Sequence, residues 1–224
     1  MSERVAIVAG AGGGGLGRAT AEKLAAAGFT VAGVDRNQEA LKELPDGIRR
    51  EAADPAAARS VVDRIAAEAG PPQVLVNTIG TFRPGEALTA TPGDLRLMID
   101  VNVGAALWLT QAVVPYLRER GSGSVVHVAA RPGLEPAAGM AAYAVSKAAL
   151  VHLTRVLDLE LRPLGIRVNA VAPQQLDTAK TRPYLTPDLL AHAVAPGAVA
   201  DIIVYLVSDA AAPVSGAIVP AYGT

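Results

Sequence analysis

The sequence contains no cysteine among its 224 residues and only three histidines, His127, His152 and His192. The absence of cysteine excludes disulfide bonds, thiol catalysis and metal sites ligated by thiolates. Three scattered histidines do not predict a multi-histidine metal site, so no metal is expected. Lys and Arg total 20 and Asp and Glu total 21, which gives a formal net charge of −1. A chain this close to neutral lacks the positive excess typical of proteins that bind nucleic acid or anionic membranes.

Long uninterrupted hydrophobic runs are also missing, although 51% of the residues are hydrophobic and only 18% are charged. The most apolar segment, 101–117, contains polar residues and Pro115, which argues against a membrane span. The apolar run after Arg4 is short and leads directly into glycines, so it does not form a signal peptide. We therefore expect a soluble, cytoplasmic protein with no membrane partner, folded as a single domain over residues 1–224.

Short apolar runs alternate along the chain with segments of helical periodicity. This alternation predicts an α/β fold with a mainly parallel sheet that is covered by helices on both faces. In the longest helix, Pro115 is a candidate for a kink. Strands are expected at 5–9, 29–34, 48–53, 74–76, 124–129, 166–171 and 216–219. Helices are expected at 18–27, 38–44, 55–69, 92–120, 140–161, 187–193 and 200–208.

A glycine-rich turn lies between the first expected strand and the first expected helix. Such a turn lets the backbone approach a pyrophosphate, and the helix amino end supplies N–H donors. Asp35 ends the second strand eighteen residues beyond Gly17, where a carboxylate can accept hydrogen bonds from the adenosine ribose. Its charge would repel a 2′-phosphate, so NAD(H) is favoured, while the nearby Arg18 and Arg36 keep NADP(H) as the less favoured alternative. The sequence thus predicts a doubly wound, Rossmann-type, three-layer αβα domain that binds a dinucleotide.

Tyr143 and Lys147 are four residues apart in the helix expected at 140–161, and therefore share one face of it. A lysine ammonium near a phenol favours the phenolate and lowers its pKa from about 10, which makes the tyrosine a usable general acid or base. A Tyr-x-x-x-Lys spacing is common by itself. Downstream of a dinucleotide-binding turn, it indicates proton transfer coupled to the chemistry of the cofactor.

The segment Ala-Tyr-Ala-Val-Ser-Lys-Ala-Ala at 142–149, together with the glycine turn, resembles the classical short-chain dehydrogenase/reductase family. The similarity extends along almost the whole chain. Segment 75–80 resembles the family's Asn-Asn-Ala-Gly segment, and 101–104 resembles the helix segment that carries its catalytic asparagine. Segment 167–173 resembles the strand that leads to the nicotinamide.

The resemblance implies three catalytic residues. Tyr143 would exchange a proton with the substrate oxygen, Lys147 would hold the nicotinamide ribose and tune Tyr143, and Asn102 would keep a water in a proton relay. The family also implies a small-molecule substrate and assembly as a homodimer or homotetramer. The implied cofactor site consists of Gly10, Gly12, Gly15, Leu16, Gly17, Asp35, Arg36, Asp54, Asn77, Gly80, Tyr143, Lys147, Pro173 and Thr178.

The sequence departs from the family's pattern at three places. In the atypical glycine turn, counting back from Gly17 puts Ala11 at the first glycine, whereas the use of Gly10 requires one extra residue. The family's catalytic serine, thirteen residues before the tyrosine, corresponds to Ala130. Gln174 replaces the glycine of the family's Pro-Gly. The residues expected near the substrate are Ala130, Arg131 and Gln174.

These features lead to one main expectation and two alternatives. The main expectation is an NAD(H)-dependent oxidoreductase that interconverts a carbonyl and a secondary alcohol, with Tyr143 as the general acid or base. Ala130 also leaves open a non-redox cyclase, dehydratase or isomerase on the same scaffold. The third possibility is a dinucleotide-binding protein with little catalysis. His127 lies in an expected buried strand, so we interpret it as a hydrogen-bonded core residue rather than a catalyst.

Overall fold

The computed structural model describes residues 4–13, 15–52, 57–179 and 181–223. In this part of the chain the strands form one seven-stranded sheet in the order β3-β2-β1-β4-β5-β6-β7, and every pair of neighbours is parallel. The strands are β1 (Val5–Ala9), β2 (Thr30–Asp35), β3 (Arg49–Ala52), β4 (Pro72–Asn77), β5 (Gly123–Val128), β6 (Ile166–Pro173) and β7 (Ile218–Ala221).

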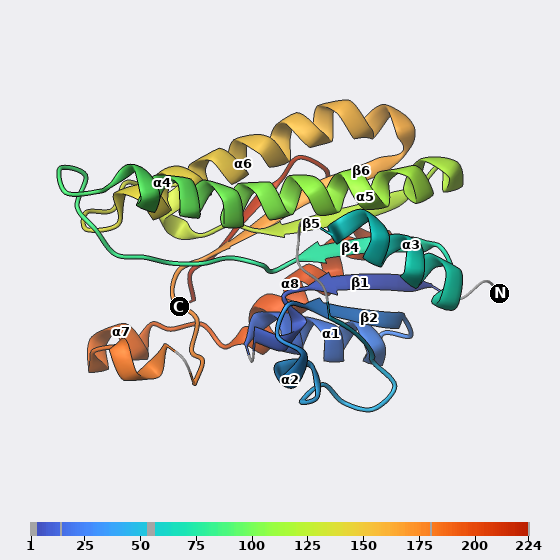
Figure 1. Ribbon diagram of the computed structural model, residues 1–224, viewed down its shortest axis with the longest axis horizontal. Helices are drawn as coiled ribbons and strands as arrows, with labels where there is room; N and C mark the ends of the chain where they lie inside the picture. The colour runs from blue at the N-terminus through green and yellow to red at the C-terminus, as the bar shows by residue number, and fades with distance from the viewer. Residues whose placement is uncertain (1–3, 14, 53–56, 180, 224) are drawn as a thin grey trace.

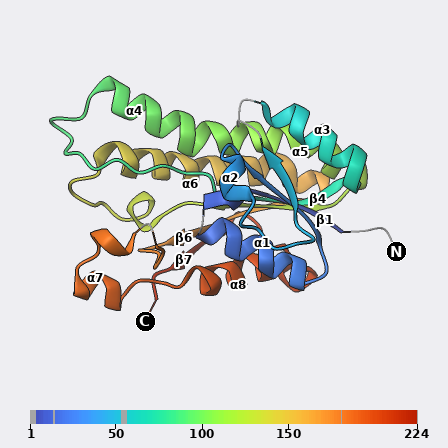
Figure 2. The ribbon, with the colours of Figure 1, turned by 60° about the horizontal axis from the view of Figure 1, so that its bottom comes forward.

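Helices cover both faces of the sheet, with α3, α5 and α6 on one side and α1 and α8 on the other (Figures 1 and 2). This arrangement confirms the predicted three-layer, doubly wound Rossmann-type fold. The helices are α1 (Leu16–Ala26), α2 (Gln38–Leu41), α3 (Ala58–Ala69), α4 (Pro92–Ile99), α5 (Ala105–Arg120), α6 (Ala141–Leu161), α7 (Pro187–Ala191) and α8 (Pro196–Val207).

The central strand β1 shows why the sheet lies in the middle layer. All five of its residues are buried, because helices pack on both of its faces. Its side chains alternate between the faces: Ala6 and Val8 join the core beside α1 and α8, whereas Ile7 joins the core beside α3 and α5. An uninterrupted apolar run is therefore the expected sequence of a parallel strand covered on both sides.

The helical stretch predicted at 92–120 consists of three segments. Helix α4 begins with a capping box, in which Thr91 and Asp94 each accept a hydrogen bond from the other's backbone N–H. Between α4 and α5, the five residues Asp100–Gly104 form a π-helical segment. The predicted kink at Pro115 is not the place where the helix changes, since Pro115 lies within the continuous α5. The irregularity comes instead from the wider π turn, which interrupts the regular i→i−4 hydrogen bonding.

In the described residues, the continuous stretch Pro92–Arg120 is the one helix whose length and mean hydropathy of 1.5 would suffice to cross a membrane. Length and composition are the whole of that evidence, and 44% of the apolar window is buried within the protein. Its α5 part contributes Leu109, Val113 and Leu117 to the core against the sheet. The stretch therefore packs in this fold as a core helix does.

A buried polar pair lies on adjacent strands near the carboxyl end of the sheet. Asn77 of β4 and His127 of β5 are register partners, and both are fully buried. Burial of His127 confirms the interpretation of a core residue, but the expected hydrogen bond is not found. Both of its ring nitrogens lack a hydrogen-bond partner among the described residues, as does Nδ2 of Asn77. Burial, with a smaller contribution from the positive charge of Lys147, lowers the pKa of His127 to about 4.

We expect the substitution His127→Asn to flatten the acid dependence of stability. The imidazole titrates near 6.5 in the unfolded chain but at about 4 in the folded protein. Between these values the unfolded state binds more protons, so the free energy of unfolding falls as the pH falls. This contribution amounts to about 2 kcal/mol between pH 7 and pH 5. Urea unfolding at both pH values measures it.

The exposed His152 on α6 provides the control. His152→Asn is expected to keep the wild-type difference between pH 7 and pH 5. An equal difference in wild type and His127→Asn would contradict the depressed pKa.

Candidate active site

The candidate site lies at the edge of the sheet where β1 and β4 end. These two strands are neighbours in space, although the chain passes through β2 and β3 between them. In open α/β sheets, ligands bind outside the carboxyl ends of the strands at such a switch point. The residues predicted for the cofactor and for catalysis come from segments that leave the sheet at this edge.

The glycine turn is built on a close contact between its first and last glycines. Gly10 has a φ of +86°, and its N–H donates to the carbonyl oxygen of Val34 at 2.8 Å. A Cβ on Gly17 would lie 2.2 Å from the carbonyl oxygen of Gly10, so only glycine fits there. Gly10 therefore lies at the end of β1 with a backbone conformation that favours glycine, in direct contact with Gly17.

Asp35 is anchored directly against this turn. Its Oδ2 accepts from the N–H of Gly12 at 3.1 Å, and its Oδ1 accepts from the N–H of Asn37 at 2.9 Å. Gly15 is the N-cap of α1, and Leu16 begins the helix and is buried. The turn therefore combines a helix amino end, positions without Cβ atoms and a carboxylate, which is a donor and acceptor set that fits a dinucleotide. Arg36 is exposed beside Asp35.

The segment after β6 folds back over the glycine turn. Pro173 is the last residue of β6, and Gln174 follows it. A Cβ on Gly15 would lie 3.0 Å from Cγ2 of Thr178, which places Thr178 directly above the turn. The Thr178 hydroxyl lies 2.9 Å from the hydroxyl of Thr181. Segments more than 150 residues apart in the sequence thus come into contact at the glycine turn.

Asn102 and Lys147 meet beside Gly80. A Cβ on Gly80 would lie 3.2 Å from both Oδ1 of Asn102 and Nζ of Lys147. The buried Asn102 accepts from the N–H of Thr81 at 2.8 Å and donates to Oγ of Ser146 at 2.9 Å. The π-helical segment carries this asparagine, and Asn77 ends the neighbouring strand. The predicted positions Gly80 and Asn102 therefore lie beside the lysine, and Asn77 ends β4 three residues before Gly80.

Tyr143 and Lys147 do share one face of α6, but burial determines the pKa of each side chain. The Lys147 ammonium is 4% exposed, donates to the carbonyl oxygen of Val128 at 2.9 Å, and lies 5.9 Å from the centre of the Tyr143 ring. Burial lowers the pKa of Lys147 to about 8 and raises the pKa of Tyr143 to about 12. The prediction that the lysine lowers the tyrosine pKa is wrong for the protein alone, because desolvation opposes the phenolate.

Phe82 is a site residue that sequence reasoning missed. Its ring packs edge-on against the Tyr143 ring with 5.0 Å between centroids, yet 55% of Phe82 is exposed. One signal in the sequence could have identified Phe82. It is an aromatic residue two positions after Gly80, in a chain where only 4% of the residues are aromatic. A cavity of about 160 Å³ borders Ala142, next to Tyr143, and extends toward Arg83 and Asp94.

Ala130 follows β5 and is 4% exposed. The short 3₁₀ turn after it packs on α6, since a Cβ on Gly133 would lie 2.7 Å from the carbonyl carbon of Lys147. Arg131 donates to Glu135 and to Oε1 of Gln174, each at 2.8 Å.

The guanidinium of Arg131 also lies 4.8 Å from the ring centre of Tyr222, which sequence reasoning did not identify. Arg131 and Gln174 are thus hydrogen-bonded to each other. Because the Arg131 guanidinium also contacts Glu135 and Tyr222, it is not a free donor. Asp54, predicted near the adenine, lies outside the described residues. Among the residues that are described, no three His, Asp or Glu side chains gather so that they could hold a metal ion.

Residues 4–188 match the short chain dehydrogenase family. A 2,3-dihydro-2,3-dihydroxybenzoate dehydrogenase of Bacillus subtilis is 35% identical over 185 residues, which are 78% of this chain and 70% of that protein. A 4-formylbenzenesulfonate dehydrogenase of Comamonas testosteroni is 31% identical over 240 residues, or 96% and 95% of the two chains.

Among solved structures, L-sorbose reductase from Gluconobacter frateurii, complexed with NADPH and L-sorbose, has a TM-score of 0.90 at 27% identity. The match covers 99% of this chain and 96% of that one. The extent of these matches agrees with the architecture of the sheet and with the arrangement of segments at its carboxyl edge. The chain therefore belongs to the short-chain dehydrogenase/reductase family of oxidoreductases.

Proposed function

We propose that this protein is an NAD(H)-dependent oxidoreductase that interconverts a carbonyl group and a secondary alcohol on a small molecule. The observation that carries the proposal is the convergence of Tyr143, Lys147 and Asn102 at the edge of the sheet that also holds the glycine turn. These groups come from separate segments of the chain, Asn102 from the π-helical segment and Tyr143 and Lys147 from α6.

The cofactor would be held by the elements around the glycine turn. The amino end of α1, which begins after Gly15, would supply N–H donors to the pyrophosphate, while Gly10 and Gly17 let the turn pack closely against the chain itself. Asp35 would accept from the adenosine ribose, and Lys147 would donate to the nicotinamide ribose. Thr178 lies where the turn is covered from above. When bound, the nicotinamide supplies or accepts the hydride.

Tyr143 would exchange the proton with the substrate oxygen. With a pKa of about 12 the phenol is protonated at neutral pH, which suits it to donate its O–H proton to the carbonyl oxygen during reduction. Lys147, with a pKa of about 8, carries its charge at pH 7 and supports the electron-rich phenol oxygen as the proton leaves. Asn102 would hold a water for reprotonation, since its amide lies beside the lysine.

Two departures from the family's pattern shape the proposal. We infer that Ala130 occupies the position of the catalytic serine, so the site has one hydroxyl donor fewer for the carbonyl oxygen. Loss of one such preorganised donor typically lowers the rate by a factor on the order of 10²–10³. The glycine turn would be atypical, because Gly10 begins it with one residue more than the family's spacing.

The substrate would meet an apolar wall on one side and a polar wall on the other. Phe82 presents an exposed aromatic ring against Tyr143. The joined side chains of Arg131 and Gln174 would supply polar groups to the substrate. This combination suits a small carbonyl compound with one apolar and one polar end.

We further propose a homodimer or homotetramer in the cytoplasm, in which residues 1–224 act as one domain. The exposed apolar side chains on the outer helices of the sheet's α5–α6 face support the association. Trp108 of α5 is 41% exposed and Leu159 of α6 is 70% exposed.

A second candidate function is favoured by Ala130. Carbonyl polarisation for hydride transfer is what the missing hydroxyl would serve, so a cyclase, dehydratase or isomerase could use Tyr143 as acid or base without it. A dinucleotide-binding protein with little catalysis is the third candidate. Product analysis separates the redox enzyme from the others, because only hydride transfer changes the amount of NADH.

The substitution Tyr143→Phe is expected to lower kcat for carbonyl reduction by a factor of about 10³ while leaving NADH affinity unchanged. The phenyl ring keeps the contact with Phe82 but has no proton to donate, and general acid catalysis is typically worth 10²–10⁴. NADH consumption and NADH fluorescence titration measure the two effects. The half-exposed Tyr205 on α8 provides the control Tyr205→Phe, and equal activity of both variants would refute the role of Tyr143.

The wild-type protein is expected to use NADH in preference to NADPH, and Asp35→Ser is expected to reduce that preference at least tenfold. The carboxylate accepts from the ribose hydroxyls and repels a 2′-phosphate. The measurement is the ratio of kcat/KM for the two cofactors. Asp46→Ser changes an exposed carboxylate elsewhere and should leave the ratio unchanged. A wild-type preference for NADPH would contradict the assignment.

The substitution Ala130→Ser is expected to raise kcat for carbonyl reduction by about tenfold or more, because it restores a hydroxyl donor near the substrate oxygen. A broad carbonyl panel with NADH tests wild type and variant side by side. Ala129→Ser, at the neighbouring buried position, is the matched control. Conversion of a substrate with no net change in NADH would favour the non-redox candidate instead.

A further inference from the structure

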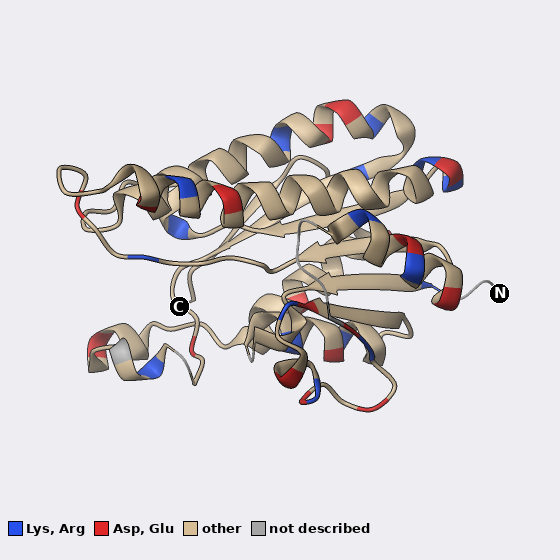
Figure 3. Cartoon of the chain, in the orientation of Figure 1, with Lys and Arg blue, Asp and Glu red and all other residues tan. Residues whose placement is uncertain are grey.

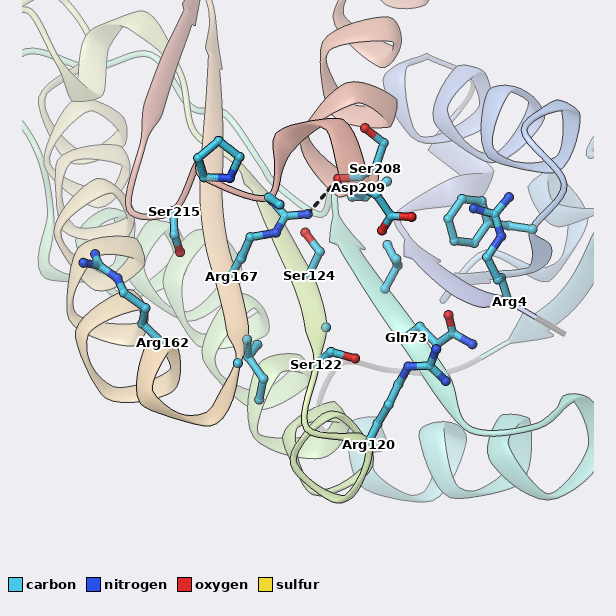
Figure 4. Close-up of a pocket in the computed structure, with 18 residues that line it drawn as sticks. Arg4, Gln73, Arg120, Ser122, Ser124, Arg162, Arg167, Ser208, Asp209 and Ser215 are labelled. Atoms are coloured by element: carbon cyan, nitrogen blue, oxygen red, sulfur yellow. Dashed lines mark hydrogen bonds between the residues drawn. The ribbon is translucent and has the colours of Figure 1, made fainter. Parts of the chain in front are cut away.

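A cavity of about 610 Å³ lies at the opposite edge of the sheet from Tyr143 (Figure 4). Its walls come from the amino ends of three strands, which contribute Gln73 of β4, Ser124 of β5 and Arg167 of β6. The carboxyl end of α8 and the following residues complete it, including Ser208 and Asp209. The dinucleotide and catalytic residues leave the sheet at the other edge, so this cavity is separate from the proposed active site.

Four arginines line the cavity, and two of them have their charge balanced locally. Arg162, which directly follows α6, forms an ion pair with Asp158 of that helix. Arg167 donates to three backbone carbonyl oxygens, those of residues 206, 208 and 214, and Asp209 faces it electrostatically. Figure 4 shows Arg167 beside Ser124 near the centre of the cavity, with Arg162 on one flank.

The other two arginines have no carboxylate partner among the described residues. Arg4 donates to the carbonyl oxygen of Ala27 at 2.6 Å and stacks over the Phe29 ring at 4.3 Å. The side chain of Arg120, the last residue of α5, makes no ion pair or hydrogen bond within the described part of the chain. Both line the flank of the cavity opposite Arg162 (Figure 4). The cavity therefore holds two uncompensated positive charges in a protein whose net charge is −1.

We propose that this cavity binds the phosphate group of a small metabolite. A phosphate monoester carries a charge of about −1.5 to −2 at pH 7, which is opposite in sign to the two uncompensated guanidinium groups that line the cavity. Planar guanidinium forks are the donors best suited to phosphate oxygens. Ser122 lines the cavity next to Arg120 and offers a further hydroxyl donor.

The size and the surroundings of the cavity indicate a small molecule rather than a polyanion. A volume of about 610 Å³ lies within the usual 300–1,000 Å³ range of small-molecule sites. A polynucleotide would require a basic face, whereas acidic and basic residues are interspersed over the surface elements (Figure 3). Because a phosphate alone would fill little of the volume, the bound molecule is expected to extend beyond its phosphate group.

Calorimetric titration at constant ionic strength tests the proposal, with inorganic phosphate and glycerol 3-phosphate as separate probes. We expect one site per chain, and at least tenfold weaker binding of both probes in Arg120→Gln. Arg118→Gln is the matched control, because Arg118 is exposed on the same helix but does not line the cavity. Tighter binding of glycerol 3-phosphate would identify an organic phosphate as the ligand, and equal binding would identify the phosphate group alone.

Amide chemical shifts locate the bound anion. The expected shifts are at Ser122, Gly123 and Gly165, which line the cavity. Shifts confined to Gly12 and Gly17 would place the anion at the glycine turn and overturn the proposal. An absence of saturable binding, or an equal loss of affinity in Arg118→Gln and Arg120→Gln, would overturn it as well.

Discussion

The contact between the two ends of the glycine turn is the constraint on which the site depends. The carbonyl oxygen of Gly10 occupies the space where a side chain of Gly17 would begin, so helix α1 starts against the end of β1. Thr78, after β4, donates both its N–H and its hydroxyl to the carbonyl oxygen of Ala9, each at 2.8 Å. The ends of β1 and β4 are thereby held together at the switch point.

The elements of the fold were predictable because their causes are local. Parallel strands covered on both faces require continuous apolar runs, and Val5–Ala9 is such a run. Glycine ends α1 for an equally local reason, since Gly28 has a φ of +82°. The π-helical segment Asp100–Gly104 has no comparable signal, because its wider turn depends on packing around Asn102. Pro115 was the strongest local signal for a kink, yet it lies within the continuous helix α5.

The sequence predicts which of the candidate site residues share a helix face, but not how burial sets their pKa values. The spacing of Tyr143 and Lys147 fixes which face they share, whereas their pKa values depend on how deeply the surrounding loops bury them. Desolvation acts on both groups and favours the neutral form of each. Phe82 and Tyr222 entered the site through loop and chain-end geometry, which one sequence does not specify. His127 shows the same limit: its burial follows from the strand, but its missing partners do not.

The π-helical segment also lets two faces of one long helix be set independently. An α-helix advances by about 100° per residue, so one additional residue in a turn rotates everything downstream by that angle. Met98 before the wide turn and Asn102 within it are buried and contact each other, while Leu109 and Val113 beyond it pack in the core against the sheet. In a regular α-helix, an insertion or deletion that brought Asn102 to its position would rotate Leu109 and Val113 away from the sheet. The π turn therefore separates the two requirements: the position of the Asn102 amide can change during evolution while the packing of α5 against the sheet is kept.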